Sequence, residues 1–168
     1  MKSYSFEILS RKYGKFKIII DDEDKKLVLL YTWCINVQKT GYYRIQGKNY
    51  KKNWRVSPTK IHRLILGIKD SKIRIDHING NTLDNRKCNL RICTQGQNLY
   101  NLKVNRSNNT SGYKGVSWYN REKRWFAEIS ANNKKYCLGR FKNKIDAAKA
   151  YNIAALKYHG EYACLNPV

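Results

Sequence analysis

An acid beside a histidine opens the stretch of this sequence whose residue types match phosphodiester chemistry. The imidazole of His77 titrates near neutral pH and can take a proton from water, which makes it a candidate general base. A carboxylate oxygen of Asp76 and an amide oxygen of Asn98 suit a hard divalent cation. Such an ion would neutralise a phosphate and stabilise its leaving oxygen. These residues therefore predict a one-metal site that hydrolyses phosphodiester bonds.

The local chain geometry would divide the roles of the two neighbours. Adjacent residues on a strand point to opposite faces, so His77 should approach a phosphate from the side opposite an ion on Asp76. Asn79-Gly80 predicts a hairpin turn, because both residues tolerate positive φ. Asn89 ends the loop, and a short amide there can bond backbone groups. We expect Asn89 to hold the loop and thereby orient His77.

Two helices should flank the loop. Ser57-Pro58 predicts the start of the first helix. His62 on that helix suits packing or phosphate contact, and Arg63 suits phosphate contact. Thr94 and Gln97 predict a capping box for a second helix that ends near Val104. The apolar face of the first helix should pack under the loop through Ile61, Leu64, Ile65 and Ile68.

The ordered set resembles the HNH nuclease motif, the ββα-metal site of many phage and intron-encoded homing endonucleases. His77 matches the first position, Asn89 the middle position and Asn98 the last. The resemblance covers roughly residues 55 to 104. It implies that Asp76 and Asn98 bind Mg²⁺ or Mn²⁺, that His77 and Asn89 are the catalytic residues, and that the substrate is double-stranded DNA. It also implies DNA contacts for Arg63 and Arg91.

The charge of the chain favours a polyanionic partner. The 168 residues include 34 Lys and Arg against 12 Asp and Glu, a net charge of +22. Residues 1–104 carry 22 of the basic and 8 of the acidic side chains, so both parts of the chain are basic. Such an excess is typical of nucleic-acid binding. A merely basic surface, or a protein of the ribosomal type, would show the same excess.

The cysteines and the apolar pattern indicate the cellular compartment in which the protein is expected. The five cysteines are odd in number and form no Cys-x-x-Cys pair, and no secretory signal or long apolar run occurs. We expect reduced thiols in a cytoplasmic protein that does not bind membranes and is a monomer or a homodimer. A zinc site at Cys88 and Cys93 is the alternative, although their spacing is not that of a zinc knot.

The region before the motif should contain short strands. Residues 1–20 are rich in β-formers, and further strands are predicted near Trp33, at 42–45 and at 54–56. The acids at 21–24 could bind a metal. They are better explained by a short helix through Leu30 whose dipole they favour.

A polar, turn-forming run at 105–112 predicts a linker to a second module. Strands are predicted at 115–119, 125–131 and 134–141, with a turn at Asn132-Asn133. Asn143 should cap a helix that ends near Tyr158. The apolar stripe of that helix is expected to be Ile145, Ala148, Tyr151, Ala155 and Tyr158.

This second pattern resembles the ethylene-response-factor (Apetala-type) DNA-binding domain of plants. The matching segments include 111–116, Trp125–Ile129, Leu138–Phe141 and 147–151. The resemblance implies a sheet that lies in the major groove. Several family arginines are absent, so the plant target sequence does not carry over. The implied DNA-contacting residues are Lys114, Ser117, Trp118, Arg124, Glu128, Ser130, Lys135 and Arg140, with Cys137 in a base-facing position.

Together these features predict an α+β protein with two modules. Residues 1–104 would form an N-terminal region and an HNH ββα-metal domain of small antiparallel strands and helices. Residues 113–168 would form a three-stranded antiparallel sheet packed on one helix. The predicted activity is metal-dependent DNA endonuclease of the homing type. The alternative is a non-catalytic DNA-binding regulator with a decayed nuclease half.

Overall fold

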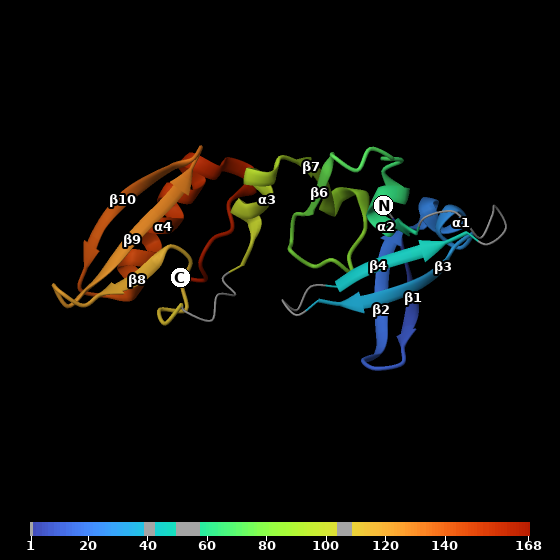
Figure 1. The fold of residues 1–168 in the computed structure, drawn as a ribbon, viewed down its shortest axis with the longest axis horizontal. Coiled ribbons are helices and arrows are strands. Elements are labelled where there is room, and N and C mark those ends of the chain that lie inside the picture. Colours follow the sequence, from blue (N-terminus) through green and yellow to red (C-terminus); the bar gives the residue numbers. More distant parts are fainter. Residues whose placement is uncertain (1, 39–42, 50–57, 104–108) are drawn as a thin grey trace. The chain divides into compact units, whose positions relative to one another are not determined.

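The computed structural model describes residues 2–38, 43–49, 58–103 and 109–168. The chain forms two compact units, Met1–Cys93 and Thr94–Val168. Both are built from small antiparallel sheets with a few helices (Figure 1), which agrees with the predicted mixture of strands and helices. In the described residues, no helix is both long and apolar enough to cross a membrane.

The first unit begins with a hairpin and a small sheet. Strands β1 (Ser3–Ser10) and β2 (Gly14–Asp21) pair in register, as the β-rich sequence predicted. A 3-10 turn, η1 (Asp22–Asp24), and the short helix α1 (Lys25–Val28) follow. The order of the next sheet is β3-β4-β5, with bounds Thr32–Val37, Tyr43–Lys48 and Thr59–Lys60.

The remaining elements of this unit surround the predicted motif. Helix α2 (Ile61–Ile65) precedes strand β6 (Arg74–His77). A loop and the 3-10 turn η2 (Lys87–Asn89) then lead to strand β7 (Leu90–Cys93), which pairs with β6. One apolar core joins the hairpin, α1, α2 and β7. Its best-buried members are Ile18, Ile20, Val28 and Ile61.

Three expectations for this unit need correction. The helix predicted to start at Ser57-Pro58 begins at Ile61, because Thr59 and Lys60 pair with β4 before the helix starts. Helix α1 ends at Val28 rather than Leu30. Asn79-Gly80 does not form a tight hairpin turn, since β6 and β7 pair across the whole intervening loop. Ser57 and the strand predicted at 54–56 lie outside the described residues.

The acids at 21–24 support the loop through Lys87. Asp21 is buried and its Oδ2 accepts the Lys87 backbone N–H at 2.8 Å. The Lys87 ammonium lies 3.1 Å from Asp24 Oδ1 and also pairs with Glu23. None of these acids caps a helix with its side chain. Three of these acids lie in the first turn of η1, as the helix-dipole expectation requires, and the contacts with Lys87 also tie the end of β2 to the loop before β7.

The second unit starts with helix α3 (Gln95–Asn101). Strands β8 (Val116–Tyr119), β9 (Arg124–Ala131) and β10 (Lys134–Phe141) form an antiparallel sheet in the order β10-β9-β8. Helix α4 (Lys144–His159) packs on one face of the sheet (Figure 1), and the 3-10 turn η3 (Gly160–Tyr162) follows. Strand and helix positions agree closely with the predicted ones. The linker predicted at 105–112 lies partly outside the described residues.

The core between α4 and the sheet depends on small side chains. Ala147, Ala148, Ala154 and Ala155 are buried, and Tyr151 fills the space beside them. Ile145, expected in this stripe, is instead 39% exposed. The alanines allow the helix axis to approach one face of the sheet closely, and within the described part of the unit the other face carries no helix.

Candidate functional site

The β6–β7 hairpin carries the predicted acid–histidine pair. Asp76 faces Arg91 in the ladder, and His77 faces Leu90. Both Asp76 and His77 are buried, with 8% and 6% of their surface exposed. Their polar partners are different, as expected for neighbours on opposite faces of a strand.

The carboxylate of Asp76 is held by Arg91. Nε and Nη2 of Arg91 donate to Asp76 Oδ2 at 3.1 and 2.9 Å. Charge-assisted hydrogen bonds of this kind are shorter and stronger than those between neutral groups. Arg91 was expected to contact DNA, and the structure shows it paired with this acid. A DNA contact by Arg91 stays a prediction.

The imidazole of His77 lies between an amide and a second imidazole. Its Nε2 is 3.2 Å from Asn85 Oδ1. The His62 ring meets it edge-on, with centroids 5.4 Å apart and planes at 85°. Burial lowers the pKa of His77, although Asn85, Asp76 and Asp84 oppose that shift. His77 is therefore a neutral base near pH 7, which is the form a general base needs.

His62 packs beside His77 as a second neutral ring. Burial, together with the neighbouring His77, Lys60 and Arg63, lowers the pKa of His62 to about 3. A cationic His62 would stand against three basic groups. Its position fits the packing role that was one of the two expectations.

Asn89 closes the loop between the two strands. Its Oδ1 accepts the backbone N–H of Asn79 at 2.9 Å, and its Nδ2 donates to Asn79 Oδ1 at 3.0 Å. The same Nδ2 donates to the carbonyl of Asp84 at 2.8 Å. The buried amide of Asn89 thus joins Asn79 and Asp84, two points of the loop that follows His77 in the chain.

Helix α3 carries Asn98 and packs within the second unit. Thr94 and Gln97 form the predicted capping box, and the helix ends at Asn101 rather than Val104. The ring of Tyr100 stacks on His159, with centroids 3.7 Å apart. Asn98 is half-buried on this helix. Asp76 and Asn98 belong to different units, so their shared ligation of one ion stays a prediction.

Lys114 also attaches α3 to its unit. Its ammonium donates to the carbonyls of Tyr100 and Leu102, the latter at 2.8 Å. Positive charge at the carboxyl end of a helix is favourable. Lys114 was expected to contact DNA, and the structure shows it bonded to the end of α3.

The donor chemistry of Asp76 fits a hard cation. A carboxylate offers lone pairs on two oxygens, and oxygen is the ligand that such an ion prefers. No three His, Cys, Asp or Glu side chains gather as metal ligands within the described residues. The zinc alternative would use Cys88 and Cys93. Cys88 is exposed whereas Cys93 is buried, so the two thiols lie in different surroundings.

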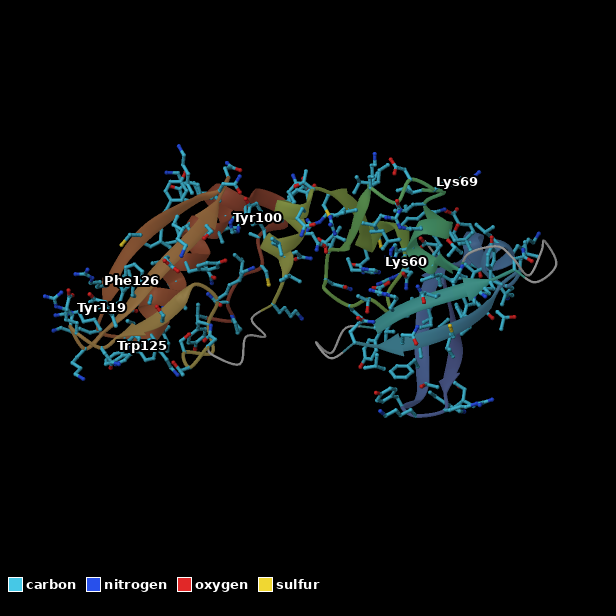
Figure 2. The ribbon with its side chains drawn as sticks, viewed as in Figure 1. Lys60, Lys69, Tyr100, Tyr119, Trp125 and Phe126 are labelled. Carbon is cyan, nitrogen blue, oxygen red and sulfur yellow. The ribbon has the colours of Figure 1, made fainter. Side chains whose placement is uncertain are left out.

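Basic side chains gather on the first unit around Lys60 (labelled in Figure 2). Partial burial lowers the pKa of Lys60, and the charges of Arg44, Arg63 and Arg74 lower it further. Concentrated positive charge of this kind attracts phosphates. Arg63 itself donates to the carbonyls of Asp70, Ser71 and Ile73, so much of its guanidinium serves the turn after α2.

The uncovered face of the β8–β10 sheet collects most of the side chains predicted to contact DNA. Ser117, Phe126 and Arg140 lie in one row across the three strands. The next rows pair Glu128 with Cys137 and Ser130 with Lys135. Arg124 has the same strand parity as Phe126 and Glu128, and so belongs to this face. We call these eight residues the open face.

Two predicted DNA contacts on the sheet have other partners. Trp118 packs edge-on against Trp125, with ring centroids 5.0 Å apart, and Trp125 belongs to the core under α4. Trp118 is therefore not on the open face. Arg140 bonds Glu122 at 2.6 Å and lies over the ring of Tyr119. Figure 2 shows Tyr119, Trp125 and Phe126 along β8 and β9.

Asn85 is the residue at this site that the sequence reasoning missed. It is fully buried, and it is the side chain that meets the Nε2 atom of His77. The available signal was its place in Leu83-Asp84-Asn85, where an apolar residue anchors the loop beside two turn-forming polar residues. That signal indicates a tight loop but not which amide reaches the histidine.

Comparison with known proteins gives consistent results. A family model described as HNH endonuclease matches residues 60–100, which include β6, the loop, β7 and most of α3. An uncharacterised HNH endonuclease of Acanthamoeba polyphaga mimivirus is 28% identical over 97% of this chain and 81% of its own length. Protein 3.8 of Escherichia phage T7 is 33% identical over 53% of this chain and 72% of its own length.

A second set of relatives comes from plants. An AP2-like ethylene-responsive transcription factor of Arabidopsis thaliana is 42% identical over 62 residues, which are 36% of this chain and 12% of that protein. This match is partial, and the plant-type domain remains a proposal. The family model covers the nuclease motif, and the mimivirus relative carries the same family in its name. On that evidence, the chain belongs to the HNH endonuclease family.

Proposed function

We propose that this protein is a divalent-metal-dependent endonuclease that hydrolyses phosphodiester bonds of double-stranded DNA. The observation that carries the proposal is the neutral, buried His77 beside Asp76 on β6, within the segment that matches the HNH model. A base and an ion-binding acid on opposite faces of one strand can act on a phosphate from two sides.

Each residue would have one task. Asp76 and Asn98 would hold the ion, Mg²⁺ or Mn²⁺, which when bound would neutralise the phosphate and stabilise the leaving oxygen. His77 would accept the proton of the attacking water. Asn89 would keep the loop closed so that the imidazole does not turn away. Arg91 would keep the Asp76 carboxylate oriented.

The open face would bind the DNA. Its sheet presents Arg124, Lys135 and Arg140 together with Phe126, and basic groups beside an aromatic ring suit a nucleic-acid surface. The similarity over 62 residues to an AP2-like ethylene-responsive transcription factor supports the same assignment. Backbone contacts by Lys60 and its basic neighbours would add affinity that falls as salt rises.

Plasmid cleavage tests the proposal. Supercoiled DNA should be nicked or linearised with Mg²⁺ or Mn²⁺ and should stay intact with EDTA. His77→Ala should lose at least about a hundredfold in rate, because general bases contribute 10²–10⁴, while DNA binding is retained. Asp76→Ala and Asn98→Ala should lose metal-dependent cleavage. Binding without cleavage by the wild-type protein under every divalent ion would overturn the proposal and favour a DNA-binding regulator.

A further inference from the structure

The amide of Asn85 can present only its oxygen to His77. Asn85 Nδ2 donates to the carbonyl of Thr82 at 3.2 Å, and a carbonyl oxygen only accepts hydrogen bonds. The other end of the amide, Oδ1, is the atom 3.2 Å from His77 Nε2. The orientation of the amide is therefore set by its neighbours rather than by an arbitrary choice between oxygen and nitrogen.

This orientation decides where the imidazole proton lies. An amide oxygen has no proton to give, so His77 Nε2 must be the donor in the contact. A neutral imidazole has one N–H, and the lone pair then belongs to Nδ1.

The backbone of Asn85 is held by strand β2, which lies much earlier in the chain. Its N–H donates to the carbonyl of Ile19 at 2.7 Å, and the Ile19 N–H donates to Leu83 at 2.9 Å. These two bonds make a short parallel bridge between β2 and the loop. Asn85 has no exposed surface, so water does not compete for the amide.

We propose that Asn85 is a positioning residue that selects the tautomer of His77, holding the proton on Nε2 and leaving the Nδ1 lone pair as the base. The strand β2 would serve the same task by anchoring Asn85 through Ile19. The inference rests on the proposed role of His77 as general base. In the reaction, the water proton would pass to Nδ1, and the resulting imidazolium would keep its Nε2–H···Oδ1 bond to Asn85.

The tautomer can be read directly, without metal or DNA. Long-range ¹H–¹⁵N spectra of ¹⁵N-labelled full-length protein in EDTA distinguish a protonated imidazole nitrogen from one with a lone pair. The chain has three histidines, and the His77 signals are identified by their loss in His77→Gln. The wild type at pH 8 should have Nε2 protonated and Nδ1 unprotonated. A wild-type ring with its proton on Nδ1 would overturn the proposal.

Variants separate this contact from general support of the loop. Asn85→Leu should give a mixture of tautomers, with the two nitrogen signals moving toward each other, and at least about a tenfold loss in single-turnover cleavage. Asn85→Asp keeps an acceptor and should retain the Nε2–H form. Asn81→Ala removes the bond from the Leu83 N–H to Asn81 Oδ1 in the same loop and should leave the tautomer unchanged.

The outcomes distinguish the proposal from the proposed function. An unchanged tautomer in folded Asn85→Leu would overturn the role of Asn85, whatever the cleavage rate. If Asn85→Leu fails to fold, Asn85→Asp decides, because loss of the Nε2–H form there would contradict an acceptor role. The expected tautomers in a wild-type protein that never cuts DNA would support the role of Asn85 and reject the nuclease assignment alone.

Discussion

The guanidinium of Arg91 holds Oδ2 of Asp76 through two nitrogens, at 2.9 and 3.1 Å, across the β6–β7 ladder. The two side chains are only 11% and 10% exposed. The Asp76 carboxylate, which is expected to bind an ion, is therefore already placed by the positively charged side chain of Arg91. Removing either side chain takes away the opposite charge that this pair supplies to a buried group.

Arg91→Ala should destabilise the first unit by about 2–3 kcal/mol, near the lower end of the cost of breaking buried ion pairs. Urea unfolding at pH 7.5 measures the change. Arg74→Ala is the matched control, because Arg74 lies on β6 and is exposed. Its effect should stay within about 0.5 kcal/mol. Equal effects of the two substitutions would contradict the importance of the pair.

Asn89→Ala should open the loop before β7. The substitution removes three hydrogen bonds, including the one to the buried carbonyl of Asp84, and should cost about 2–3 kcal/mol. Hydrogen exchange of the Asn79 amide should quicken more than exchange within β1 and β2. Asn36→Ala, an exposed amide on β3, should change neither quantity. An unchanged Asn79 exchange rate would reject the closing role of Asn89.

Stability of the first unit should fall in acid because of His62. The pKa of His62 is lowered to about 3 in the folded protein, whereas an unfolded imidazole titrates near 6.5. Between these values the unfolded chain binds a proton that the folded chain does not, so the contribution is complete above pH 6.5 and is lost as pH falls toward 3. The loss from pH 7.5 to pH 5 should be about 2 kcal/mol.

His62→Leu measures that contribution. The variant should show a flatter dependence of unfolding free energy on pH, although His77 keeps a residual slope because burial lowers its pKa too. Urea titrations of both proteins at several pH values provide the comparison. Parallel curves would mean that His62 titrates normally in the folded state.

Gly115→Ala should unfold the second unit, whereas Gly112→Ala should be tolerated. Both glycines have positive φ, at +71° and +78°. A Cβ at Gly115 would lie 2.2 Å from Tyr151 Cδ2 and 2.5 Å from the Glu128 carbonyl oxygen, but at Gly112 it would meet nothing within 4 Å. Gly112→Ala should cost about 1 kcal/mol from its backbone conformation alone. Thermal unfolding followed by circular dichroism should separate the two, and similar losses would contradict the steric argument.

DNA affinity should depend on the open face rather than on α4. Arg124→Ala with Lys135→Ala should weaken binding and reduce the slope of log K against log salt by about 0.9 for each phosphate that the protein no longer neutralises. Lys149→Ala removes the same kind of charge from an exposed position on α4. It should leave the slope unchanged in fluorescence anisotropy titrations. A decrease in affinity half as large as that of the double variant would indicate an effect of net charge alone.

Local patterns predicted much of this fold. The alternation in β8–β10, the turn at Asn132-Asn133 and the caps at Thr94 and Asn143 all occur where neighbouring residues determine the conformation. In each case the interacting groups are a few residues apart in the chain. The start of α2 was missed because Thr59 and Lys60 pair with β4, a partner that local preferences do not report.

The candidate site was predictable only in part. The motif positions Asp76, His77 and Asn89 follow from residue type and spacing, but their partners do not. The Asp76–Arg91 pair depends on the register of β6 against β7. The backbone hydrogen bond that fixes Asn85 depends on Ile19, which is distant in sequence. The contacts with Lys87 likewise join acids at 21–24 to a loop that lies more than sixty residues later in the chain.

The stack of Tyr100 on His159 has a practical consequence for dissecting the protein. The His159 ring is itself anchored by the Ser130 carbonyl, and the backbone N–H of Asn132 donates to the Tyr100 hydroxyl. Cutting the chain after α3 would strip that helix of every one of these supports. Loss of cleavage in a shortened protein would then reflect a damaged helix as much as a missing DNA-binding surface. Single substitutions, and not deletions, are therefore the way to assign functions to the two units.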